Sequence, residues 1–90
     1  MPKIARYKAF VIFMWAYDFA ERRHVHIINN KSGYHNPAKI WLDTLEWMDS
    51  GELSEQDRAE MERVISKNID KINKQIDILE TGAKSKPINL

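Results

Sequence analysis

FVIFMW, residues 10–15, is apolar at every position. A strand with one face in water alternates apolar and polar residues, whereas a continuous apolar run is typical of a strand covered on both faces. Branched and aromatic side chains favour a strand here, and the run is shorter than the roughly 20 apolar residues that a membrane span needs. We therefore expect a central strand within an extended segment from Ile4 to Tyr17.

The basic residues Lys3, Arg6 and Lys8 precede this run, which is the order found in secretory signals. The run ends at Asp18 without a small-residue cleavage motif, and its composition suits a buried strand better. The chain has no cysteine, which fits a reducing compartment. The sequence therefore predicts a cytoplasmic protein that does not enter the membrane.

Shorter strands are expected downstream of this segment. Residues 24–28 and 38–45 have strand-like composition, and the stretch NNKSGYHNP between them is rich in turn-forming residues. A further short strand or bend is expected at 45–49, before Gly51. Together these segments predict a three- or four-stranded antiparallel sheet.

The sequence pattern changes from Ser54 onward to that of a helix. Ser54 is a favourable N-cap, acidic residues follow it, and lysines come later, as the helix dipole prefers. Apolar residues recur every three or four positions, and Gly82 can end the helix. We expect an α+β fold with one long C-terminal helix over 55–80, a single domain over 1–82 and a flexible tail over 83–90.

A continuous helix of that length would overhang the sheet. It would extend roughly 39 Å, whereas strands of five or six residues are only about 20 Å long. The overhang predicts a contact with a second copy or a small cognate partner through the stripe Ile69, Ile72, Ile76 and Leu79. The competing interpretation is that the chain bends near Asn73 and folds back onto its own sheet.

Charge is distributed unevenly along the chain. Residues 1–39 hold seven basic and two acidic side chains, a net charge of +5, and residues 40–80 hold five basic and eleven acidic ones, a net charge of −6. A polyanion would bind the basic half. The candidate nucleic-acid-binding residues are Arg22, Arg23, Lys31, Lys39 and Trp41.

The stretch ERRHVHIINN, residues 21–30, places two histidines one residue apart. Side chains alternate along a strand, so His24 and His26 share a face with Arg22 while Val25 and Ile27 face the core. If residues 38–45 pair with this strand, Lys39, Trp41 and Asp43 join the histidines on that face.

Four interpretations of the two histidines remain open. They could be acid and base of a metal-independent ribonuclease, with Arg22 or Lys39 stabilising phosphate charge. They could bind a metal, although the third ligand would have to be His35, Glu21 or Asp43. They could be structural residues that are hydrogen-bonded to nearby acids and packed under Trp41. They could also belong to a surface that binds a nucleic acid without catalysing a reaction. The sequence predicts neither a metal site nor a cofactor. If the protein is an enzyme, the catalytic candidates are His24 and His26.

Several segments together resemble the bacterial domain-of-unknown-function 4160 family: MPKIARY, FVIFMW, HVHI and AKIWLDTLEWMDSGEL. The resemblance implies an antiparallel sheet packed on a C-terminal helix in a cytoplasmic bacterial protein, with no established reaction. It also implies one half of a two-gene cassette of the toxin–antitoxin kind. The family usually has two prolines before the histidines, where this chain has Arg22 and Arg23. We therefore expect an interaction component of such a cassette that contacts RNA, with the small ribonuclease as the alternative.

Overall fold

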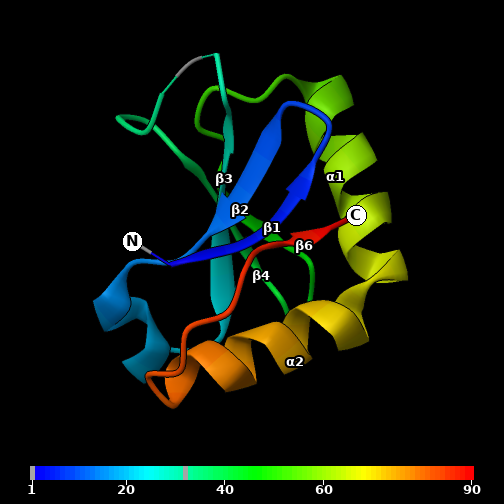
Figure 1. The fold of residues 1–90 in the computed structure, drawn as a ribbon. Coiled ribbons are helices and arrows are strands. Elements are labelled where there is room, and N and C mark those ends of the chain that lie inside the picture. Colours follow the sequence, from blue (N-terminus) through cyan, green and yellow to red (C-terminus); the bar gives the residue numbers. More distant parts are fainter. Residues whose placement is uncertain (1, 32) are drawn as a thin grey trace.

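Six strands form one sheet, and two α-helices meet at an angle beside it (Figure 1). The computed structural model describes residues 2–31 and 33–90. Along the chain the elements are β1 (Lys3–Tyr7), β2 (Phe10–Phe13), the 3-10 helix η1 (Ala16–Ala20), β3 (His24–Asn29), β4 (Ala38–Trp41), β5 (Trp47–Asp49), α1 (Glu55–Lys67), α2 (Ile69–Glu80) and β6 (Ile88–Asn89).

The strand order is β5-β4-β3-β2-β1-β6, with antiparallel neighbours except for the parallel pair β1 and β6. The expected α+β class is confirmed. The sheet is larger than the predicted three or four strands, and it is mixed rather than purely antiparallel.

The expected extended segment from Ile4 to Tyr17 is divided into a hairpin and a 3-10 helix. The chain reverses between Tyr7 and Phe10, which pair with each other, and Lys8 has a positive φ of 52°. Tight hairpin turns usually place glycine or asparagine in this left-handed conformation, so the Lys-Ala turn gave no recognisable signal. Lys8 is held by an ion pair of 2.9 Å with Glu60 on α1.

Strand β2 is buried along its whole length, as the apolar run predicts. On one face, Ile12 joins a core that includes Val25, Ile40 and helix residues such as Met61. On the other face, Val11 and Phe13 form a smaller cluster with Ile28, against which Trp15 and Tyr34 pack. Among the described residues, neither α-helix contributes to this second cluster.

Strand β4 ends at Trp41, so the expected strand over 38–45 is too long. Leu45 has a positive φ of 60°, and its N–H donates to the carbonyl of Trp41 at 2.8 Å. This turn leads directly into β5, which confirms the short strand expected within 45–49.

The continuous helix expected over 55–80 is broken at Asn68. The Asn68 side-chain amide donates to the Val64 carbonyl at 2.8 Å, and its backbone has φ −115° and ψ 21°, outside helical geometry. The Val64 carbonyl, which also accepts from the Asn68 backbone N–H, thereby gains a second hydrogen bond at the end of α1, and α2 starts in a new direction.

The bend removes the predicted overhang. Ile72 and Ile76 are 0% and 1% exposed within the chain's own core, and Ile69 and Leu79 pack against the same core. The expected exposure of this stripe is wrong for Ile72 and Ile76, because folding back buries them, while the contact with a second copy or partner stays a prediction. The competing interpretation is closer, although the bend lies at Asn68 rather than near Asn73.

The last residues form more structure than the flexible tail expected over 83–90. Strand β6 pairs with β1, and the Leu90 N–H donates to the Arg6 carbonyl at 2.8 Å. The buried Gln75 side chain of α2 donates to the Lys86 carbonyl and accepts from the Ser85 hydroxyl. A two-residue strand leaves no periodicity in the sequence, so only these contacts define it. Within residues 2–31 and 33–90, no helix has both the length and the apolar character needed to cross a bilayer.

Candidate histidine–aspartate site

The pairing of β3 with its neighbours brings the predicted site together. His24 lies opposite Trp41 and His26 opposite Lys39, while Phe13 of β2 lies opposite His26 on the other side. Residues directly opposite in neighbouring strands share a face. We call this side of the sheet the histidine face; its members are Lys3, Arg6, Val11, Phe13, His24, His26, Ile28, Lys39 and Trp41.

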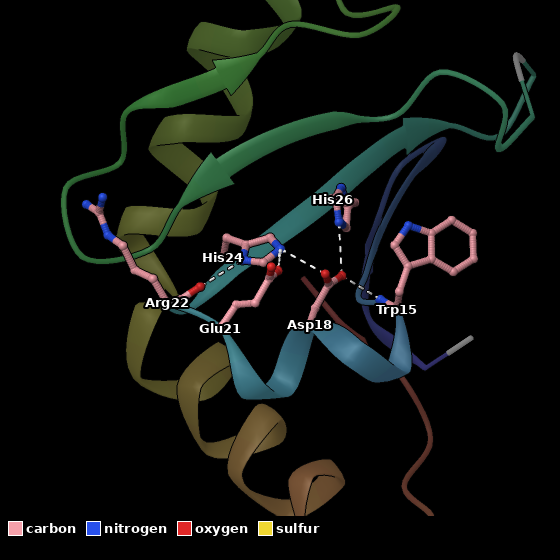
Figure 2. Close-up of polar contacts among 6 residues, drawn as sticks. All are labelled: Trp15, Asp18, Glu21, Arg22, His24 and His26. Atoms are coloured by element: carbon pink, nitrogen blue, oxygen red, sulfur yellow. Dashed lines mark hydrogen bonds and ion pairs between the residues drawn. The ribbon is translucent and has the colours of Figure 1, made fainter.

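Asp18 of η1 is the acid that the histidines meet. Its carboxylate is almost fully buried and accepts a hydrogen bond of 2.8 Å from the Trp15 N–H. The Asp18 N–H in turn donates to the Trp15 carbonyl, which fixes the short helical turn. Figure 2 shows the carboxylate pointing from this turn toward both imidazoles.

His24 is completely buried and its ring is held from both ends. Its Nδ1 lies 2.7 Å from the Arg22 carbonyl oxygen, which can only accept, so Nδ1 carries a proton. Its Nε2 lies 3.2 Å from Asp18 Oδ1 and 3.9 Å from Glu21 Oε2. Among the described residues, Nε2 has no hydrogen-bond partner of suitable geometry.

His26 contacts the second oxygen of the same carboxylate, with Nε2 3.0 Å from Asp18 Oδ2. Burial lowers the pKa of His26 below its ordinary value of 6.5, although the charge of Asp18 acts in the opposite direction. Its side chain is 12% exposed, and its Nδ1 is buried without a partner among the described residues. Neutral His26 is therefore the favoured form near neutral pH.

Aromatic rings surround the two imidazoles. Phe13 stacks on His26 with centroids 5.4 Å apart, and Trp41 meets His24 edge-on at 5.4 Å. Trp15 and Tyr34 pack edge-on against Phe13, each at 5.2 Å. The rings pack around the site, where His24 is fully buried and His26 has little exposed surface.

Three of the five predicted nucleic-acid-binding residues gather beside the site. The Arg22 guanidinium lies 4.2 Å from the Trp41 ring centroid, and the Lys39 ammonium lies 4.8 Å from it. Arg22 also forms a two-pronged ion pair with Asp43, which holds the pKa of that carboxyl below its usual range. Part of the positive charge of Arg22 is thus already neutralised.

The other two predicted residues lie elsewhere. Arg23 points to α2, where it pairs with Asp77 and Glu80, and so it ties β3 to that helix. Lys31 is exposed beyond the far end of β3. Arg23 and Lys31 thus lie away from the contacts of Arg22 and Lys39 with Trp41, and their part in RNA binding stays a prediction.

The geometry argues against a two-histidine ribonuclease. An acid–base pair must reach the substrate, but His24 has no exposed surface and its Nδ1 is occupied by a backbone carbonyl. Only His26 has an exposed edge. The structural interpretation, that acids hydrogen-bond the histidines under Trp41, describes the contacts better, with His24 more deeply buried than expected.

The site includes one residue that the sequence did not reveal. Asp18, His24 and His26 each offer a ligand atom, all within 4.8 Å of one another. Of the third ligands considered from the sequence, His35 is exposed near Glu52 and Asp43 is paired with Arg22, whereas Glu21 is at the edge of the site. The only available signal for Asp18 was a lone acid between apolar neighbours directly after a buried strand.

Comparison with known proteins identifies the family but no characterised relative. Neither the curated proteins nor the solved structures contain a significant match. The sequence model of one family, described as a domain of unknown function (DUF4160), matches residues 9–75, which include β2, η1, the histidine face from β2 to β4, and α1. The chain belongs to the DUF4160 family.

Proposed function

We propose that this protein binds single-stranded RNA through its histidine face, as the interaction component of a two-gene cassette of the toxin–antitoxin kind. One observation supports the RNA contact most directly: the row Lys3, Phe13, His26 and Lys39 crosses the sheet on one face and places a lysine at each end, beside rings that are partly exposed. Single-stranded nucleic acids are bound by stacking their bases on rings and pairing their phosphates with such flanking cations.

Partly exposed rings are available for stacking beside this row. Trp15, Tyr34 and Trp41 are each partly exposed and belong to the same ring cluster. Stacking of a base on an aromatic side chain contributes about 1–3 kcal/mol, whichever base it is. The surface therefore suits a flexible strand of little sequence preference better than a duplex.

Phosphate contacts are expected from the cations that have no acidic partner. Among the described residues, the ion pairs within 4.0 Å do not involve Lys3, Arg6 or Lys39. Lys3 and Arg6 also line a shallow hollow beside Asn30, one residue before Lys31. A strand crossing the face from Lys39 to this hollow would meet positive charge at both ends.

The RNA proposal can be tested by fluorescence anisotropy with a labelled oligouridylate of about 12 nucleotides, a typical length for such sites. We expect weak binding at low ionic strength whose affinity falls steeply with added salt, because counterions are released from the RNA. The double variant Lys3→Glu, Lys39→Glu should weaken binding and flatten the salt dependence.

Lys74→Glu is the matched control, because Lys74 is exposed on α2. This substitution changes the charge at its site by the same amount as Lys3→Glu or Lys39→Glu does. It should bind like wild type. Absence of binding at low salt, salt-independent binding, or equal losses in the control and the double variant would remove the RNA proposal.

The place in a cassette rests on the family resemblance and has its own test. The product of the adjacent small gene, co-expressed with this protein, should co-purify with it and alter its effect on growth. An isolated gene, or a neighbour that neither binds nor changes growth, would contradict this part of the proposal.

A further inference from the structure

We propose that Asp18, His24 and His26 bind one divalent transition-metal ion of the zinc class, with Glu21 at the fourth position. This site goes beyond the RNA proposal and does not depend on it. The three side chains come from two elements, η1 and β3, and Figure 2 shows Asp18 between the imidazoles with Glu21 beside His24.

The proton positions of His24 carry the argument. Because its Nδ1–H donates to the Arg22 carbonyl, a neutral His24 presents a lone pair at Nε2. That lone pair faces the Asp18 carboxylate at 3.2 Å and the Glu21 carboxylate at 3.9 Å, with no donor among the described residues. Two of these three electron-rich groups, the His24 imidazole and the Asp18 carboxylate, are buried, and a cation between them and Glu21 would remove their mutual repulsion.

The distances suit a metal ion as that cation. Zinc binds imidazole nitrogen and carboxylate oxygen at about 2.0–2.2 Å, so neighbouring ligands of a tetrahedral site lie about 3.3–3.5 Å apart. His24 Nε2 lies 3.2 Å from Asp18 Oδ1 and 3.9 Å from Glu21 Oε2, and His26 Nε2 lies 3.0 Å from Asp18 Oδ2. The ligand atoms of Asp18, His24 and His26 all lie within 4.8 Å of one another, so side-chain rotations would draw them to tetrahedral spacing around an ion. Two neutral imidazoles and two carboxylates would balance the charge of a divalent ion.

The surroundings have the features of a supported metal site. A metal-binding histidine usually donates its other ring N–H to a backbone carbonyl or carboxylate, as His24 does to Arg22. The Trp15 N–H similarly orients the Asp18 carboxylate. Glu21, whose side chain is 54% exposed, gives the ion a route from solvent. A bound ion would fasten η1 to β3.

The alternative to a metal ion is a proton on His24 Nε2, which would make His24 the cation. Titration with zinc chloride separates the metal-binding site from the protonated histidine. Chelator-treated, dialysed wild-type protein is titrated by isothermal calorimetry at neutral pH without RNA. We expect one zinc per chain. Asp18→Asn and His26→Gln should each weaken binding at least about tenfold, while circular dichroism checks their fold.

His35→Gln is the control, because His35 is the remaining histidine and its side chain is 75% exposed outside the cluster. It should bind zinc like wild type. Binding of cobalt to the wild-type protein tests the site without any substitution. The bound cobalt ion should show the visible absorption spectrum of a four-coordinate site with nitrogen and oxygen ligands. The proposal is overturned by the absence of saturable one-to-one binding, by unchanged affinity in folded Asp18→Asn and His26→Gln, or by loss of binding in His35→Gln.

Discussion

At the scale of single residues, the Asp18 carboxylate organises the site. One oxygen faces His24, and the other accepts from the Trp15 N–H and contacts His26. A buried carboxylate is costly unless it is paired and hydrogen-bonded, so these contacts explain why it can lie at 2% exposure. The same contacts hold the two imidazoles in fixed positions, which is what separates this site from an incidental pair of surface histidines.

The lowered pKa of His26 predicts a pH dependence of stability. Burial keeps folded His26 neutral at pH values where an unfolded histidine, with its ordinary pKa of 6.5, takes up a proton. The unfolded state then binds more protons, so stability rises with pH. The contribution of His26 is fully present above its ordinary pKa and is lost as pH falls toward its lowered folded value.

Urea unfolding of wild type and His26→Gln at several values between about pH 5 and 7.5, with chelator present, measures this contribution. The difference in unfolding free energy between the two proteins should shrink on acidification. The exposed His35→Gln should follow wild type at every pH. A difference that is constant, or that grows in acid, would show that His26 does not carry the effect.

At the scale of elements, the break at Asn68 determines what the second helix does. A straight helix would carry Ile72 and Ile76 beyond the sheet, whereas the bend brings them onto it. At Asn68 the Val64 carbonyl accepts from both the backbone N–H and the side-chain amide, so α1 ends without leaving this carbonyl unpaired. The bend thus gives Ile72 and Ile76 contacts within the chain's own core.

Truncation of side chains on α2 tests whether this helix packs into the chain's own core. Ile76→Ala should lower the unfolding free energy by about 2–5 kcal/mol, the usual cost of removing buried methyl groups. Ile78→Ala in the same helix should change it by less than about 0.5 kcal/mol, because Ile78 is 38% exposed and outside the core. Urea titrations compare the two, and equal effects would contradict the burial of Ile76.

At the scale of the whole molecule, one core joins the sheet to both helices. It contains residues of β1, β2, β3, β4, α1 and α2, for example Ile4, Ile12, Met61 and Ile72. The sheet edges are the short strands β5 and β6, which limits unpaired backbone that could join another chain. The helices pack on the face opposite the histidine face, and among the described residues neither contributes to the cluster of Val11, Phe13 and Ile28.

A shared core predicts a single cooperative unfolding transition. Far-UV circular dichroism reports mainly α1 and α2, and tryptophan fluorescence reports Trp15, Trp41 and Trp47 around the sheet. The two signals should change at the same urea concentration, as in other small domains that unfold in two states. Loss of the helical signal before the fluorescence change would show that α2 is an independent unit.

The sequence by itself determined the features that local patterns encode. The apolar run at 10–15 identified the doubly covered strand β2, and the alternation around His24 and His26 placed both of them on one face of their strand. Ser54 was expected to cap the helix, and its hydroxyl accepts from the Asp57 N–H. Each feature depends on neighbours within a few residues, so composition and spacing suffice.

Only the tertiary structure decided which distant segments meet. The 3-10 turn that carries Asp18 to the histidines, the bend at Asn68 and the strand β6 depend on contacts rather than periodicity. The sequence offered third ligands by their type alone, and it missed Asp18 because nothing in it predicted the 3-10 helix at 16–20. A chain reversal of one or two residues leaves almost no pattern, yet it determines which side chains share a site.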